Sequence, residues 1–73
     1  MNDIEKARLE RIESFKKLEK LLNKHNITMY QLSKELDFGM SMLSDWKSGR
    51  SKPKIEKLSK IADYFGVDVQ YFI

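Results

Sequence analysis

Apolar residues recur along this chain every three or four positions, which is the spacing of α-helices that bury one face. Neither proline nor glycine interrupts residues 2–24, so we expect one long helix there, ended by His25 and Asn26. Its buried stripe is strongest in the second half and continues weakly towards the N-terminus. The stripe consists of Ile4, Leu9, Ile12, Phe15, Leu18, and Leu21 or Leu22.

Residues 1–14 carry three bases and four acids, a net charge of −1, and few apolar positions. We therefore expect an N-terminal helical extension that packs on little of the remaining domain, residues 15–73. A mixed-charge helix of this kind is either a solvated, fraying extension or a helix that binds a partner. The sequence leaves both interpretations open.

Two short helices joined by a tight turn are predicted over residues 28–49. Thr28 is an N-cap residue, and Gln31 stands three positions later, as in a capping box. The helical pattern breaks at residues 37–39, where aspartate and glycine tolerate turn dihedral angles, and resumes over residues 40–48. Gly49 then follows, where a helix C-terminus favours a positive φ. This arrangement is typical of a helix-turn-helix.

Two more helices are predicted in the rest of the chain. Pro53 suits the start of a helix, an apolar stripe runs through residues 54–65 and ends at Gly66, and Asp68 is an N-cap for a last short helix. No stretch alternates with period two, so the fold class is all-α: a compact bundle of five helices, the first one extended. The expected core is Leu18, Leu21, Ile27, Leu32, Leu36, Phe38, Leu43, Trp46, Ile55, Leu58, Ile61, Phe65, Val67, Val69 and Phe72.

The free face of the helix at 40–48 is small and polar. Leu43 and Trp46 are spaced to share the buried side, where the indole N–H needs a partner. The opposite side fits a DNA major groove, and Asp45 can accept a hydrogen bond from a cytosine amino group. Met40, in the first turn, either contacts a thymine methyl group or packs on neighbouring apolar residues. The free face carries Ser41, Ser44, Asp45 and Ser48, with Met42 on its flank.

The net charge is +3, and its distribution tells more than its size. An acid-free segment directly after the helix-turn-helix holds four bases within residues 47–54. Basic residues at this exit are placed to bind DNA phosphates. They are Lys47, Arg50, Lys52 and Lys54.

Length and composition exclude several other classes. Seventy-three residues make one domain, and there is no cysteine. A lone His25 without neighbouring ligands does not make a metal site, and no acid pair or glycine-rich loop suggests an enzyme. No apolar run reaches the roughly 18 residues of a membrane span. We therefore expect a cytoplasmic, non-enzymatic protein without cofactor, metal, membrane or small-molecule ligand.

These motifs, in this order and spacing, resemble the Cro/CI-type (XRE-like) helix-turn-helix family of phage and bacterial repressors. The resemblance covers about residues 15–73. Three segments carry it: Ile27-Thr28-Met29 with Leu32-Ser33 and Leu36-Asp37-Phe38; the stretch 43–53, with Trp46, Gly49 and Pro53; and the stretch 58–72, with Ile61-Ala62 and Phe65-Gly66-Val67.

The resemblance implies a sequence-specific transcriptional repressor that binds a palindromic operator in double-stranded DNA through the helix at 40–48. Binding as a homodimer is implied, with dimer formation coupled to DNA binding if the dimer is weak. The alternative is a protein-interaction module on the same fold, such as an antitoxin or anti-repressor subunit, which the long first helix favours.

The resemblance also assigns roles to residues. Met29 replaces the family's usual glutamine, so the phosphate contact there passes to backbone N–H groups or to Tyr30. Residues implied to read bases are Met40, Ser41, Met42, Ser44 and Asp45. Those implied near phosphates are Thr28, Met29, Tyr30, Lys47, Arg50, Ser51, Lys52 and Lys54, and those implied in the dimer contact are Val69, Gln70 and Tyr71.

Overall fold

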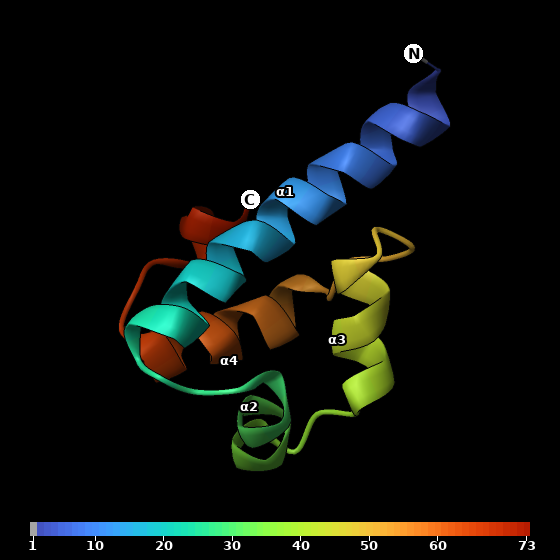
Figure 1. The fold of residues 1–73 in the computed structure, drawn as a ribbon. Coiled ribbons are helices and arrows are strands. Elements are labelled where there is room, and N and C mark those ends of the chain that lie inside the picture. Colours follow the sequence, from blue (N-terminus) through green and yellow to red (C-terminus); the bar gives the residue numbers. More distant parts are fainter. Residues whose placement is uncertain (1) are drawn as a thin grey trace.

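The computed structural model describes residues 2–73, and these residues form helices and no strands (Figure 1). The all-α prediction is therefore confirmed. The last predicted helix forms a single 3-10 turn, so the structure has four α-helices and one 3-10 helix. They are α1 (Asp3–Lys24), α2 (Met29–Leu36), α3 (Met40–Lys47), α4 (Ile55–Phe65) and η1 (Val69–Phe72).

Polar side chains cap the starts of three of these helices. Thr28 Oγ1 accepts a hydrogen bond from Gln31 N–H at 3.1 Å, and Gln31 Oε1 accepts one from Thr28 N–H at 2.8 Å, so the predicted capping box is present. Asn2 caps α1 and Asp68 caps η1 in the same way, through side-chain oxygens. Each cap satisfies a backbone N–H that the helix itself leaves without a partner.

All four α-helices end in the same way, with one residue in the left-handed region. The N–H of the residue that follows it donates a hydrogen bond back to a carbonyl oxygen in the last turn of the helix, which is the Schellman arrangement. At α1, α2 and α4 that next residue is apolar and packs on the core; at α3 it is Arg50. The left-handed residues are Asn26, Asp37, Gly49 and Gly66, followed by Ile27, Phe38, Arg50 and Val67.

The core lies between α1, α3, α4 and η1, and α2 adds the fully buried Leu32 to it. Most of the predicted core residues are buried or pack against the buried cluster, and Leu21 and Leu22 are both buried. The prediction was wrong for Ile55, which is 52% exposed. Ile55 is the first residue of α4, so the apolar stripe of this helix begins one turn before the core does.

Three aromatic rings join α1, α3 and η1. Trp46, fully buried, meets Phe15 edge-on at a centroid distance of 5.4 Å and Phe72 at 5.9 Å. Ser14 Oγ–H donates to the Phe72 carbonyl oxygen at 2.6 Å, which ties η1 to α1. The indole Nε1 has no hydrogen-bond partner among residues 2–73, contrary to the expectation for a buried tryptophan. Trp46 therefore orients α3 by packing alone.

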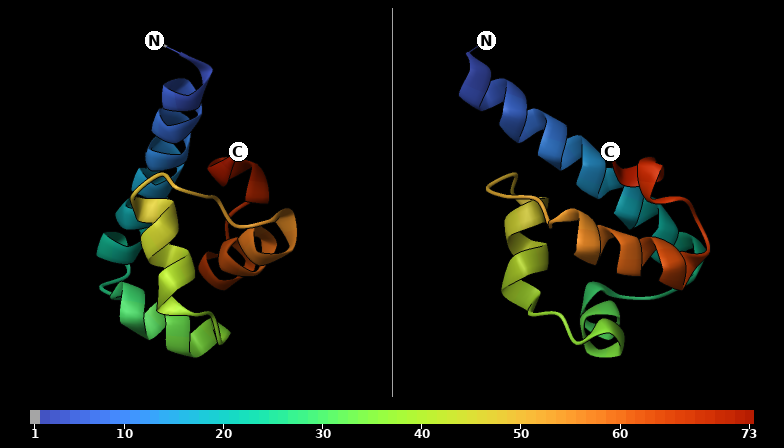
Figure 2. Two further views of the ribbon diagram at one scale, coloured as in Figure 1. Left: turned by 90° about the vertical axis from the view of Figure 1, so that its right-hand side faces the viewer. Right: turned by 180° about the vertical axis from the view of Figure 1, so that it is seen from behind.

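The molecule measures 36 × 23 × 22 Å, and α1 accounts for its long dimension. The first turns of α1 project past the loop that follows α3 (Figure 1). When the molecule is turned by 90°, this end of α1 and the length of α3 both face the viewer (Figure 2, left). The N-terminal half of α1 and the exposed side of α3 therefore lie on the same side of the protein.

Candidate nucleic-acid interface

The side of α3 that faces away from the core carries the residues predicted to read bases. Leu43 and Trp46 are fully buried, whereas Ser41 and Ser44 are exposed. Met42 and Asp45 are partly exposed on the flanks. Met40, for which packing and DNA contact were equally open, is 38% exposed at the first turn of the helix. The helix thus presents short polar side chains and one thioether to solvent.

Asp45 and Arg50 form an ion pair at the exit of α3. Arg50 Nη2 lies 2.9 Å and Nε 3.0 Å from the same carboxylate oxygen, Oδ1. This contact occupies the position where the other three α-helices place an apolar side chain against their last turn. The backbone sets it up, because Arg50 N–H donates to the Asp45 carbonyl oxygen at 2.9 Å after Gly49 adopts a φ of 80°. Asp45, predicted to read a base, and Arg50, predicted to bind a phosphate, are therefore joined by an ion pair.

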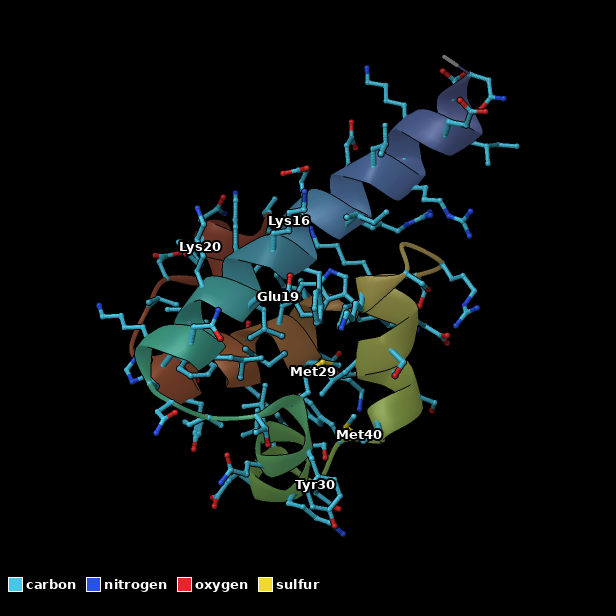
Figure 3. All side chains as sticks on the ribbon, viewed as in Figure 1. Lys16, Glu19, Lys20, Met29, Tyr30 and Met40 are labelled. Atoms are coloured by element: carbon cyan, nitrogen blue, oxygen red, sulfur yellow. The ribbon has the colours of Figure 1, made fainter. Side chains whose placement is uncertain are left out.

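The N-terminus of α2 presents backbone N–H groups without a competing acid. The first turn of α2 contains no acidic residue, so the positive end of the helix dipole is not neutralised locally. Thr28 uses its hydroxyl oxygen as an acceptor in the capping box, which leaves its proton to donate. Met29 is half-buried, and Tyr30 is 59% exposed, with Lys34 Nζ 5.3 Å from its ring centroid. Figure 3 shows Tyr30 and Met40 at the end of the molecule that α2 and the first turn of α3 form.

The basic segment that begins at the last residue of α3 divides into two parts. Lys47, Arg50, Ser51 and Lys54 are exposed. Lys52 is half-buried and turns towards α1, where it lines a groove with Leu9, Phe72 and other residues. Burial lowers the pKa of its ammonium group, and the positive charge of Lys17 lowers the pKa further, against the opposing influence of Glu10. The structure brings Lys47, Arg50 and Ser51 together at the exit of α3 and places Lys52 on a different face.

Gly49 is where the N-terminal extension meets the helix-turn-helix. A Cβ atom at Gly49 would lie 2.7 Å from Arg8 Cγ, 2.8 Å from the Arg8 carbonyl oxygen and 2.9 Å from Ile12 Cγ1. Arg11 Nη1 donates to the Gly49 carbonyl oxygen at 3.1 Å. This contact was not expected from the net charge of the extension. The available signal was helical spacing back from Phe15, since Arg8, Arg11 and Ile12 share the side of α1 that Phe15 buries.

The three residues predicted at a dimer contact lie on η1. Gln70 is exposed, while Val69 and Tyr71 pack partly against the core of their own chain. Lys17 Nζ lies 5.9 Å from the centroid of the Tyr71 ring, so one face of this ring is shielded by α1. The exposed surface of η1 is therefore centred on Gln70.

No group of three His, Cys, Asp or Glu side chains is arranged to hold a metal ion within residues 2–73. None of the described helices is both long and apolar enough to cross a bilayer.

Comparison with known proteins agrees with the geometry of α2 and α3. The sequence profile of a helix-turn-helix family matches residues 18–72. The HTH-type transcriptional activator BcrR of Enterococcus faecalis is 34% identical to this chain over 53 residues, which are 73% of the chain and 26% of the relative. The chain thus spans well under half the length of this relative. No solved structure was found to match this chain. Because the profile covers most of the chain, this protein belongs to the XRE-like helix-turn-helix family.

Proposed function

We propose that this protein is a sequence-specific transcriptional regulator that binds double-stranded DNA with α3 in the major groove. One observation carries the proposal: the exposed side of α3 consists of Met40, Ser41 and Ser44, with the partly exposed Asp45 on its flank, an acid-free helix N-terminus before it and a basic turn after it. The short side chains allow the helix axis to approach base edges, and the two flanks supply donors and cations for phosphates.

We propose further that two copies bind a palindromic operator. A single domain of this size covers one half-site, and two copies related by a two-fold axis read half-sites about one helical turn apart. Gln70 and the exposed parts of Val69 and Tyr71 are the residues that we place in the contact between the copies. Because much of Val69 and Tyr71 is buried in their own chain, that contact is small, and dimer formation is coupled to binding at adjacent half-sites.

Repression is the outcome that we propose where the operator overlaps a promoter. A bound domain excludes polymerase from the same DNA by its volume alone and needs no further contact. The relative BcrR carries the name of an activator. For this chain, activation would require an additional surface that contacts the transcription machinery.

The proposal is tested by selecting random 30-base-pair duplexes on the purified protein and titrating the enriched pool by fluorescence anisotropy at two salt concentrations. We expect a palindromic consensus and a steep loss of affinity with salt, because phosphate neutralisation releases counterions. Enrichment of no consensus, together with salt-independent binding or no binding, would contradict the proposal. Light scattering on the same sample reports whether the free protein is a monomer or a dimer.

Replacing Asp45 with alanine is expected to relax base preference and to tighten non-specific binding at the same time. The substitution removes a carboxylate that selects one base edge, and it removes a negative charge that offsets the charge of Arg50 and repels nearby phosphates. We expect about fivefold tighter binding to a random duplex, because the gain in net positive charge at the phosphates exceeds the loss of ordering of Arg50. At one base-pair position, discrimination should fall by roughly 1–3 kcal/mol.

A matched control for this substitution is Asp63→Ala. Asp63 is an exposed acid near the C-terminal end of α4, which lies away from α3 (Figure 1). Asp63→Ala changes the net charge by the same amount and should leave base preference unaltered. An Asp45→Ala protein that selects the wild-type consensus would show that Asp45 reads no base.

A protein-interaction module on the same fold is the second candidate. Its support is the apolar surface at the start of α1, where Ile4 is 81% and Leu9 45% exposed. The variants Ile4→Ser and Leu9→Ser separate the two candidates, since neither residue contacts Gly49. Loss of a co-purifying protein with unchanged DNA affinity would favour the interaction module.

A further inference from the structure

We infer that the N-terminal half of α1 is part of the DNA interface and that Arg8 binds a phosphate next to the one bound by Arg50. The inference rests on the proposed function and extends it to an element outside the helix-turn-helix. The ligand is a phosphodiester group of the duplex backbone flanking the bases that α3 contacts. The first observation is the close approach of α1 to the exit turn of α3.

The aliphatic stem of Arg8 packs against Gly49, so closely that a Cβ atom on residue 49 would overlap it. The residue after Gly49 is Arg50, and the residue before the turn is Lys47. Arg8 is exposed, and no ion pair engages it among the described residues. The two arginines therefore reach solvent from adjoining sides of a single glycine.

Arg11 fixes the relative position of these two elements. Its guanidinium donates to the Gly49 carbonyl oxygen at 3.1 Å in a partly buried environment. That bond and the Ile12 side chain against Gly49 hold α1 on the turn. Because α1 is a continuous helix from residue 3 to residue 24, Arg8 is carried on a rigid element. A cation held in this way loses less freedom on binding than one on a loose terminus.

The charges of the extension are sorted by side, although they nearly cancel in total. Glu10, Glu13 and Lys6 line the groove that α1 forms with the C-terminal turn, together with Lys17 and Lys52. Arg8 and Arg11 lie at the exit turn instead. The nearest acid by helical spacing is Glu5, three positions before Arg8, and no ion pair joins the two. The side of the extension next to α3 therefore carries two arginines against one acid, Glu5, and has a net charge of +1.

The geometry of a duplex accommodates two neighbouring arginines. Successive phosphates of one strand are about 3.4 Å apart along the duplex axis. The N-terminal half of α1 and the exposed side of α3 lie on the same side of the protein (Figure 2). A strand that passes Arg50 at the exit of α3 thus continues beneath Arg8. Each half-site then gains one phosphate contact beyond those made by α2 and the exit turn.

The test compares wild type with Arg8→Met, which keeps the apolar stem against Gly49 and removes the charge. Affinity for the selected operator is measured by anisotropy over a range of salt concentrations. We expect the slope of log K against log salt to become shallower by about 0.9 for each bound protomer, with affinity about fivefold to tenfold weaker per protomer. The selected consensus should not change, since a phosphate contact carries no base information.

Two further variants serve as controls. Arg8→Lys keeps the charge and should retain most of the wild-type slope. Lys20→Gln removes a charge from the side of α1 that is turned away from α3 (Figure 3) and should leave the slope unchanged. Phosphate-ethylation interference on Arg8→Met and Arg50→Ala should show each variant losing sensitivity at a different, neighbouring phosphate of the same strand.

The outcomes separate this inference from the function on which it rests. A wild-type protein that binds no duplex contradicts both. If wild type binds with a steep salt slope while Arg8→Met keeps that slope and loses no ethylation-sensitive phosphate, the extension lies outside the interface and the proposed function stands. An equal loss of slope in Lys20→Gln would assign the effect to net charge and would also overturn the inference.

Discussion

Replacing Gly49 with alanine is expected to destabilise the protein by about 2–5 kcal/mol. Gly49 has a φ of 80°, a conformation that costs an L-residue roughly 1–2 kcal/mol. The added Cβ would also stand 2.8 Å from the Arg8 carbonyl oxygen, a backbone atom in the N-terminal half of α1. Relieving that overlap requires α1 to move away from the exit turn, and overpacking of this kind costs roughly 1–3 kcal/mol more.

Gly66→Ala separates the two contributions. Gly66 ends α4 with a φ of 70°, close to that of Gly49, but no heavy atom beyond its own residue and its chain neighbours lies within 4 Å of the position that its Cβ would take. This variant should lose only the conformational cost, roughly 1–2 kcal/mol. Urea unfolding followed by circular dichroism measures both free energies. Equal losses in the two variants would mean that α1 does not press on Gly49 in solution.

Phe72→Ala is expected to destabilise the protein by roughly 3–5 kcal/mol, as for other fully buried aromatic side chains. Phe72 fills the space between η1 and Trp46, whose ring centroid is 5.9 Å away. Loss of the ring also loosens η1, which weakens the hydrogen bond from Ser14 Oγ–H to the carbonyl oxygen of residue 72. A buried carbonyl group without a donor lowers the stability further. A domain of this size is stable by only about 5 kcal/mol, so roughly 0–2 kcal/mol should remain, and between a few per cent and about half of the variant should be unfolded at room temperature.

Ile73→Ala is the matched control, because Ile73 is the next residue and is 61% exposed. Its substitution should change stability by less than about 0.5 kcal/mol. Thermal unfolding with Trp46 fluorescence suits this pair, since Phe72 contacts the indole directly. Should Phe72→Ala unfold at the wild-type temperature, η1 would not be docked on the core, and Trp46 would not depend on it.

The boundaries of the helices could be predicted from sequence because they depend on local chemistry. The Thr28 and Gln31 capping box, the break at residues 37–39 and the glycines at 49 and 66 each act over a few positions, and the structure contains all of them. The core was also largely predictable from helical spacing. Ile55 was the exception, because periodicity identifies a side of a helix but not how far along that side the packing extends.

The site was less predictable, because its main contacts join residues that are far apart in the sequence or that were predicted to have different roles in DNA binding. Helical spacing places Arg8 on the side of α1 that Phe15 buries, but its contact with Gly49 depends on the angle at which α1 crosses α3. Lys52 stood in a row of bases, yet the chain turns after Ser51 and directs Lys52 to α1. Asp45 was predicted to read a base and Arg50 to bind a phosphate. The structure shows that their side chains form an ion pair across the left-handed turn at Gly49. Which bases the site reads remains a prediction.

The ion pair at the exit of α3 also affects the entropy of binding. In the complex that we propose, a free arginine at this position would have to be immobilised, at a cost of about 0.5–1.5 kcal/mol in rotamer freedom. Asp45 already confines Arg50 to one rotamer through two contacts to a single oxygen. Part of the ordering is therefore completed during folding rather than at the operator. The same carboxylate that selects a base thus preorganises the neighbouring cation, and specificity and affinity at this turn cannot be altered independently.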